Sequence, residues 1–236
     1  MRNKTTMLIL ILFFAIVNNI LAQEKKKKEE GFIKIFNGKN LEGWQGDTLY
    51  WRVQDGILTG EVTAATLLKR NSFIIWKTKQ PENFELQVDY RVSAHGNSGI
   101  NYRSVLIDTL PFALKGYQAD IDGEDNWSGQ NYEERGREFL ALRGQKVIME
   151  SNQQPLLAAS LGAKDSLQTF IKKEGWNTYR LVVNGNRMLH YINGVLMSDV
   201  TDNDKASRAM KGYIGVQVHV GPPMKIEYRD FMIKEM

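Results

Sequence analysis

Every second residue is apolar through several stretches of the chain. Between Phe84 and Val92, apolar residues alternate with polar or charged ones, and residues 179–183 and 214–220 repeat the pattern. A period of two is typical of a β-strand with one buried face. Helical periodicity is scarce. The sequence therefore predicts a protein built almost entirely of β-strands.

Turn residues separate these alternating segments. Asn-Gly or Asp-Gly pairs begin at Asn37, Asp55, Asn184 and Asn193. Both residues of such a pair tolerate positive φ, which tight hairpin turns require. We expect a hairpin over residues 182–192 that turns at Gly185-Asn186, followed by a further strand over residues 195–200.

The order of these elements predicts the fold class. Many short strands without alternating helices indicate an all-β protein, a two-sheet antiparallel β-sandwich. The roughly 200 residues of 31–236 suit one such domain. Residues 122–136 are polar and lack apolar periodicity, so we expect a long loop there. Long loops in compact domains are often functional.

The first 30 residues differ from the rest. Two basic residues precede an apolar run that ends near Val17, and Ala22 stands at a suitable cleavage position. This order predicts a secretory signal peptide over residues 1–22, with an uncleaved membrane anchor as the alternative. Residues 23–30 are charged and predict a tether. We therefore expect a periplasmic or secreted protein, with no membrane span after signal cleavage and, because it lacks cysteine, no disulfides.

Charge argues against one class of function. The whole chain has 31 Lys and Arg against 27 Asp and Glu, but residues 31–236 have 25 against 24. A nucleic-acid-binding domain carries a basic surplus. We therefore expect no nucleic-acid partner.

Polar side chains gather on the outward faces of three predicted strands. The three sets are Asn101 with Arg103, Gln118 with Asp120 and Asp122, and Gln217 with His219. Amides, carboxylates and imidazoles suit sugar hydroxyls, which both donate and accept hydrogen bonds. If the three strands are neighbours, these residues line one surface and predict a carbohydrate site.

Other interpretations of single residues remain open. Arg103 could be ion-paired, Asp120 could belong to a solvated strand face, and His219 could be a structural histidine. His190 alternates with apolar residues and is expected in the core, as are Trp44, Trp51 and Trp76. His95, beside glycine, is expected in a loop. Trp127, in the polar stretch, is the candidate for stacking on a sugar ring.

The order of several short motifs resembles a known family. The motifs are IFNGKNLEGW at 35–44, WRVQDGILTG at 51–60, NSGINYR at 97–103, GYQADI at 116–121, YEERGR at 132–137 and GVQVH at 215–219. Together they resemble the 3-keto-disaccharide hydrolase domain family from about Phe32 to Ile233. Two prolines, Pro222 and Pro223, and the segment 228–230 depart from the family pattern.

The resemblance implies a concanavalin A-like jelly roll that acts on glycosides oxidised at C3. A ketone at C3 acidifies the C2 proton, so a base can start an elimination that expels the group on C1, and later addition of water gives net hydrolysis. On this resemblance we expect His219 to act as base or acid with Asp120 and Glu134, and Arg103 to polarise the ketone or hold a carboxylate. The expected substrate-binding residues are Asn97, Asn101, Gln118, Tyr132, Arg137, Gln217 and Trp127. A divalent metal with His, Asp and Glu ligands could assist the ketone, although no tight ligand spacing is visible.

Two other functions remain open. Jelly rolls also serve as lectin-like carbohydrate-binding modules without catalysis. An ordinary glycosidase would instead use Asp120 and Glu134 as its two carboxylates on unoxidised glycosides.

Overall fold

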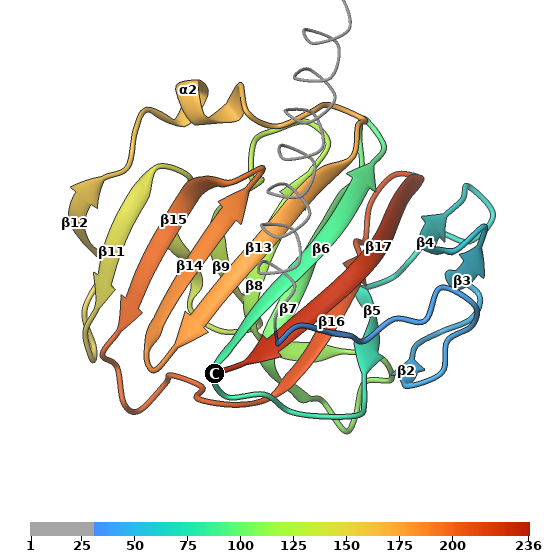
Figure 1. Cartoon of the computed structure of the whole chain (residues 1–236), viewed down its shortest axis with the longest axis horizontal. Helices are drawn as coiled ribbons and strands as arrows, with labels where there is room; N and C mark the ends of the chain where they lie inside the picture. The colour runs from blue at the N-terminus through green and yellow to red at the C-terminus, as the bar shows by residue number, and fades with distance from the viewer. Residues whose placement is uncertain (1–30) are drawn as a thin grey trace, which may run out of the picture. The chain divides into compact units, whose positions relative to one another are not determined.

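Strands make up nearly all the regular structure of residues 31–236, the part of the chain that the computed structural model describes (Figure 1). The predictions for residues 1–22 and 23–30 lie outside the described residues. The elements are β1 (Ile33–Lys34), β2 (Trp44–Gln45), β3 (Trp51–Gln54), β4 (Ile57–Val62), β5 (Ser72–Trp76), β6 (Phe84–Val92), β7 (Asn97–Leu106), β8 (Leu114–Asp122), β9 (Asn131–Glu134), β10 (Glu138–Ala141), β11 (Gln145–Met149), β12 (Leu156–Ser160), α2 (Lys164–Gln168), β13 (Asn177–Asn184), β14 (Arg187–Ile192), β15 (Val195–Asp202), β16 (Tyr213–Val218) and β17 (Met224–Glu235).

The strands form two stacked sheets. The larger sheet has the order β12-β11-β15-β14-β13-β6-β17-β4-β3, with β1 added beside β17, and the smaller sheet has the order β10-β9-β8-β7-β16-β5-β2. Figure 1 shows the larger sheet in front of the smaller one. All pairs are antiparallel except β11 with β15. This confirms the predicted all-β fold, a two-sheet β-sandwich of the jelly-roll type.

The core lies between the sheets and follows the period-two pattern. Along β6, every second residue from Phe84 to Val92 is buried and the residues between are half-buried. Trp44, Trp51 and Trp76 are buried, as predicted, and His190 is completely buried. Its ring lies between Tyr102 of the smaller sheet and Tyr179 of the larger one, with hydrogen bonds of 2.9 and 3.4 Å. His95 is exposed in the turn before β7, also as predicted.

The predicted hairpins are confirmed. β13 and β14 pair from Tyr179–Ile192 to Asn184–Arg187, and the chain turns again at Asn193-Gly194 into β15. Both Gly185 and Asn193 have φ near +50° (56° and 51°), the conformation that these turn residues tolerate.

The loop predicted over residues 122–136 is only partly right. Residues 123–130 connect β8 to β9, but residues 131–134 form strand β9, which pairs with β8. The strand escaped the sequence pattern because its buried side chains are polar: Asn131, Glu133 and Glu134. The strand matters for function, since it carries two residues of the candidate site.

Candidate functional site

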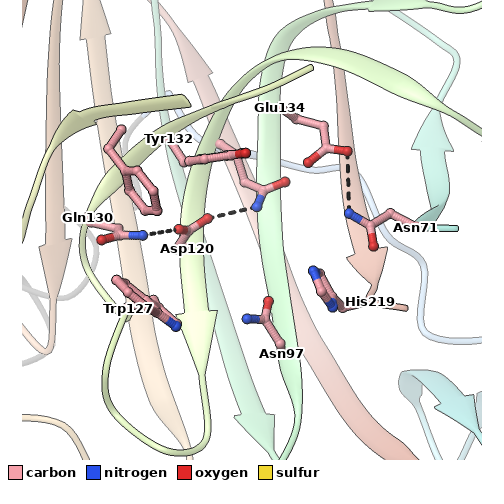
Figure 2. Close-up of a pocket in the computed structure, with 10 residues that line it drawn as sticks. Asn71, Asn97, Asp120, Trp127, Gln130, Tyr132, Glu134 and His219 are labelled. Carbon is pink, nitrogen blue, oxygen red and sulfur yellow. Dashed lines mark hydrogen bonds between the residues drawn. The ribbon is translucent and has the colours of Figure 1, made fainter. Parts of the chain in front are cut away.

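A pocket of about 200 Å³ opens on the face of the smaller sheet that points away from the core (Figure 2). On β8, Tyr117 and Ala119 belong to the core, whereas Gln118 and Asp120 point the other way and line this pocket. Its lining residues are Asn71, Asn97, Gln118, Asp120, Trp127, Gln130, Tyr132, Glu134, Phe139 and His219. They come from β10, β9, β8 and β7, from the connection between β8 and β9, and from the chain just before β5 and just after β16, so the pocket crosses most of the sheet.

Asp120 lies in the middle of this lining and is held by two amides. One carboxylate oxygen accepts a hydrogen bond from Gln118 Nε2 at 2.7 Å, and the other accepts one from Gln130 Nε2 at 2.5 Å. Gln217 Nε2 in turn donates to Gln118 Oε1 at 3.1 Å and fixes the orientation of that amide. The two N–H donors fit the ionised carboxylate, because an ionised carboxylate only accepts hydrogen bonds.

Burial acts against this ionised form. Loss of water around Asp120 raises its pKa to about 7, although the hydrogen bonds from Gln130 and Gln118 lower it and the nearby Glu134 and Asp122 raise it further. A carboxylate with this pKa is a much stronger base than an ordinary aspartate, and it is still ionised in a large fraction of molecules at neutral pH.

The glycine of the NSG motif has a specific role in this arrangement. Gly99 on β7 lies opposite Asp120, and the side chain of Gln118 crosses directly over Gly99. A Cβ at residue 99 would lie 2.6 Å from Gln118 Cδ. The missing side chain therefore leaves the room in which Gln118 reaches both Asp120 and Gln217.

Glu134 lies on the other side of Asp120 from Trp127 (Figure 2). Its carboxylate accepts a hydrogen bond from Asn71 Nδ2 at 3.3 Å and is 3.7 Å from the Arg135 guanidinium. Burial raises the pKa of Glu134, while Asn71 and Arg135 lower it. The same asparagine accepts a hydrogen bond from the backbone N–H of Val220, which ties the segment after β16 to this side of the pocket.

His219 is neutral near pH 7. Its pKa is lowered, chiefly by burial, and the carboxylate of Asp122 only partly opposes this effect. Figure 2 shows His219, Asn71 and Glu134 on one side of Asp120, Trp127 and Gln130 on the other, and Tyr132 above Asp120 with its hydroxyl pointing toward Glu134. A neutral imidazole there can accept a proton or donate a hydrogen bond.

Three aromatic rings form the opposite wall. Trp127 and Phe139 are 40% and 44% exposed, and their ring centroids are 5.6 Å apart at an interplanar angle of 33°. Tyr132 meets the Phe139 ring edge-on at 5.2 Å. Exposed rings that face a polar pocket offer an apolar surface for the C–H groups of a sugar ring. Burial raises the pKa of Tyr132, so its hydroxyl keeps its proton at neutral pH.

Seven of the eleven predicted site residues line this pocket. They are Asn97, Gln118, Asp120, Trp127, Tyr132, Glu134 and His219. The strands that carry most of them are neighbours, because β9, β8, β7 and β16 are consecutive in the smaller sheet. That adjacency was the assumption on which the sequence-based site depended.

The prediction for Arg103 is corrected by its position. The pairing of β7 with its neighbours is irregular between Tyr102 and Val105, where Arg103 has a φ of +46°, so the simple alternation of faces fails there. The Arg103 guanidinium is buried and donates to the backbone carbonyls of Glu82, at 2.6 and 2.9 Å, and Ala209, at 3.2 Å. It connects loops of the sandwich and does not line the pocket.

Arg137 was expected to bind substrate, but it does not line the pocket and instead forms ion pairs within the sandwich. Its guanidinium donates to Glu133 at 2.5 Å and to both oxygens of Asp202, in the larger sheet, at 2.6 and 3.1 Å. It therefore joins the two sheets. Asn101 and Gln217 are completely buried and do not line the pocket either. Gln217 influences the pocket only indirectly, because its hydrogen bond orients the Gln118 amide.

Three pocket residues escaped the sequence analysis. Asn71 precedes a buried strand and looked like an ordinary turn residue, and Gln130 belongs to the polar connection after β8. Phe139 follows charged residues and begins the apolar run of residues 139–142, which looks like part of an ordinary core strand. No feature of the sequence sets Phe139 apart from the rest of this run.

In residues 31–236, no three His, Asp or Glu side chains come together in a way that could hold a metal ion. The donor set around Asp120 consists mainly of amides, which act there as hydrogen-bond donors. We therefore assign no step to a metal. Within the same residues, no helix has the length and apolar character needed to cross a membrane.

Comparison with known proteins agrees with the fold and with the motifs. Residues 31–234 match the model of the 3-keto-alpha-glucoside-1,2-lyase-like domain, and the chain belongs to this family.

One curated relative and many solved structures are similar. A 3-keto-disaccharide hydrolase from Bacteroides thetaiotaomicron is 35% identical over 80 residues, which cover 31% of this chain and only 27% of that protein. A candidate glycosyl hydrolase from Parabacteroides distasonis shares the fold with a TM-score of 0.60 and 21% identity, over 89% of this chain and 96% of the other. The carbohydrate-binding module CBM66 from Bacillus subtilis does so with a TM-score of 0.54 and 15% identity, over 82% and 96%.

Proposed function

We propose that this protein cleaves 3-keto-glycosides by removing the proton on C2 and eliminating the group on C1. The observation that carries the proposal is Asp120, a buried carboxylate with a pKa of about 7 whose two oxygens are oriented by amides on the floor of a sugar-sized pocket. The C2 proton of an ordinary glycoside is not acidic enough for such a base. A ketone at C3 makes it so, which fits the family to which the chain belongs.

The two unlike sides of the pocket suggest how the substrate lies. The keto-sugar ring stacks on Trp127 and Phe139 with C2 above Asp120, and the Tyr132 hydroxyl donates a hydrogen bond to the ketone oxygen. The leaving group extends toward Asn71 and His219, whose polar groups suit hydroxyls. Glu134 lies on this leaving-group side, and its raised pKa favours the protonated form that a general acid requires.

In the proposed elimination and hydration, each proton is taken up or supplied by a carboxyl group and each electron pair moves to a defined bond or atom. Asp120 takes the C2 proton, and the C2–H pair forms an enolate that Tyr132 stabilises. The enolate collapses, the C1–O bond breaks, and the departing oxygen takes the proton of Glu134. The product is an unsaturated 3-keto sugar with a C1=C2 double bond. Water then adds to C1 while Glu134 accepts its proton, and Asp120 returns a proton to C2, so both carboxyl groups are restored.

The test compares a 3-keto-glucoside with its unoxidised parent in D₂O. We expect release of the group on C1 from the keto substrate alone, with one deuterium at C2 of the sugar product. Free 3-keto-glucose, incubated with and without enzyme, corrects for exchange that does not require cleavage. Asp120→Asn should lower kcat/KM by about 10²–10⁴-fold, as expected for loss of a general base. Glu124→Gln, an exposed change in the same connection, is the matched control.

Glu134 has its own diagnostic substrate. Glu134→Gln should slow a glycoside with an alkyl leaving group strongly and a nitrophenyl glycoside little, because nitrophenolate departs without a proton. Equal losses on both substrates would remove Glu134 from the role of general acid. Each assay is repeated with a chelator, so that a metal requirement would show as lost activity.

A non-catalytic binding module is the second candidate. Its supporting observation is the pair of exposed rings, Trp127 and Phe139, beside a polar pocket. Binding of the keto-glucoside with no release of the C1 group would establish this function. It would also exclude Asp120 as general base and Glu134 as general acid. Cleavage of the unoxidised parent, without deuterium at C2, would instead indicate an ordinary glycosidase.

Export is a separate part of the proposal. Residues 1–22 have the order of a signal peptide, and we propose that the enzyme acts in the periplasm or outside the cell. Intact-mass analysis of the protein from a producing cell tests this. A mass that lacks the first 22 residues supports export, and a mass of all 236 residues contradicts signal cleavage.

A further inference from the structure

A second cavity lies where three connections meet at the start of β5. Its volume is about 390 Å³, within the range of about 300–1,000 Å³ that is typical of small-molecule sites. Its lining residues are Asp47, Tyr50, Leu67, Leu68, Lys69, Arg70, Ser72, Pro111 and Phe112, none of which lines the pocket around Asp120. The connections are β2–β3, β4–β5 and β7–β8.

The wall of this cavity is mostly apolar. Tyr50, Leu67, Leu68, Pro111 and Phe112 supply it, and Leu67 is 54% exposed. Exposed leucine costs little as a single residue, but a hollow with several apolar side chains is a place where a ligand can bury apolar surface.

The charged side chains that line this cavity are two cations and one carboxylate, so their net charge is positive. Lys69 and Arg70 both line it, and neither forms an ion pair with any acidic group in residues 31–236. The one lining carboxylate, Asp47, accepts the backbone N–H of Leu49 at 2.9 Å and so belongs to its own turn. The cavity therefore combines an apolar wall with two available cations.

Phe112, in the apolar wall of this cavity, has an unusual backbone conformation. Its φ is +53°, a region that bulky residues rarely occupy, and its carbonyl accepts the Phe73 N–H at 2.9 Å. Backbone conformations of this kind persist only where the surroundings enforce them, and they cluster at ligand sites. Here the strained residue is part of the apolar wall.

We infer that this cavity binds a small amphipathic anion, with its apolar body against Leu67, Leu68 and Phe112 and its acidic group at Lys69 and Arg70. The site is separate from the pocket around Asp120, although Asn71, which hydrogen-bonds Glu134, lies in the chain between Arg70 and Ser72. The inference does not depend on the proposed catalytic function.

Decanoate, decan-1-ol and decyltrimethylammonium, titrated into the ¹⁵N-labelled protein below their micellar concentrations, test this inference. We expect decanoate to shift the amide signals of residues 67–72, 112 and 113 and to bind more tightly than the other two. Lys69→Gln and Arg70→Gln should each weaken decanoate binding by about fivefold. Lys205→Gln, an exposed lysine on the connection after β15, should leave it unchanged.

Three results would overturn the inference. Equal binding of decanoate and decan-1-ol would show that the cations do not contribute. Unchanged decanoate affinity in both charge variants would have the same meaning. Displacement of decanoate by a 3-keto-glucoside would assign the binding to the pocket around Asp120. As a check on the apolar wall, Leu67→Asn changes a residue that is 54% exposed, adds no charge and should weaken the binding of decanoate and of decan-1-ol alike.

Discussion

Asp120 differs from a surface carboxylate in both its solvation and its partners. Gln118 and Gln130 each donate to one of its oxygens, and Gln217 fixes Gln118 from behind. These neutral donors orient the carboxylate without adding a positive charge that would lower its pKa strongly. As a result burial dominates, and the pKa rises to about 7. A lysine or arginine at residue 118 or 130 would make a tighter contact and a weaker base.

The pH dependence of catalysis follows from this environment. With a nitrophenyl 3-keto-glucoside, which needs no general acid, kcat/KM should rise about tenfold per pH unit below pH 7 and level off above it, because only ionised Asp120 accepts the C2 proton. The residual activity of Asp120→Asn should lack this limb. If kcat/KM of the wild type instead rises only up to about pH 4, the base is an ordinary carboxylate. If the rise up to pH 7 persists in Asp120→Asn, a group other than Asp120 is responsible for it.

Gly99 offers a test that does not touch a charged group. In Gly99→Ala, the new methyl group would lie 2.6 Å from Gln118 Cδ, so Gln118 must move and release Asp120. We expect kcat/KM to fall about tenfold or more, because small displacements of a catalytic group are costly, while the protein still folds. Gly175→Ala, whose methyl group meets Lys172 Cβ at 3.1 Å in a connection away from the pocket, is the control. Full activity in Gly99→Ala would show that the position of Gln118 is unimportant.

At the level of elements, the connection between β8 and β9 shapes one side of the pocket. Residues 123–130 carry Trp127 and Gln130, and their conformation is held from beneath by Arg143. The Arg143 guanidinium is 3% exposed and donates to the carbonyls of Ser128 and Asp125 at 2.8 Å each and of Lys164 at 3.2 Å. An irregular segment that must expose a tryptophan thus gains a rigid internal support.

Removal of this support should affect both stability and catalysis. Arg143→Met leaves at least two buried carbonyl groups without a donor, which we expect to cost about 3 kcal/mol of unfolding free energy. In the variant that remains folded at low temperature, KM for the keto-glucoside should rise because Trp127 loses its position. Urea unfolding and steady-state kinetics measure the two effects. Arg52→Met, which removes an arginine from a solvent-exposed pair with Glu61 on the larger sheet, controls for the loss of a charge.

Some strands of the sandwich could be predicted from the sequence pattern and others could not. Strands with apolar alternation, such as β6 and β13, and turns with Asn-Gly pairs were predictable, because a buried face and a positive φ leave a local signature. Strand β9 left none, since its buried side chains are acids and amides, and Asn131 and Glu134 find distant partners in Tyr102 and Asn71. Arg103 was misassigned for a related reason: a bulge changes the direction of a side chain without changing the residue pattern.

At the scale of the whole molecule, the sandwich buries two titratable groups whose effects on stability oppose each other. His190 lies between the sheets, and burial lowers its pKa to about 3, well below the ordinary value of 6.5. Asp120 lies on the outer face of one sheet with its pKa raised from 3.8 to about 7. Between pH 4 and 6.5, His190 is therefore protonated in the unfolded chain and neutral in the folded protein. Over the same range, Asp120 is ionised in the unfolded chain and protonated in the folded protein. His219 acts in the direction of His190, and Glu134 in that of Asp120.

This opposition predicts different pH profiles of stability for two variants. The lowered pKa of His190 makes the folded state less stable as pH falls from 6.5 toward 3. The raised pKa of Asp120 makes the folded state less stable as pH rises from 3.8 toward 7. Where one of these groups titrates alone, the unfolding free energy changes by about 1.4 kcal/mol per pH unit. Relative to the wild type, Asp120→Asn should therefore gain unfolding free energy between pH 4 and 7, and His190→Gln should gain it between pH 6.5 and 4. Urea unfolding at half-unit pH intervals gives both differences, and each variant's constant offset from lost packing cancels in the slope. Parallel profiles for all three proteins would show that neither group titrates as its burial requires. A gain of Asp120→Asn at rising pH, together with its loss of turnover, would mean that the basicity of Asp120 is maintained at the expense of the stability of the sandwich.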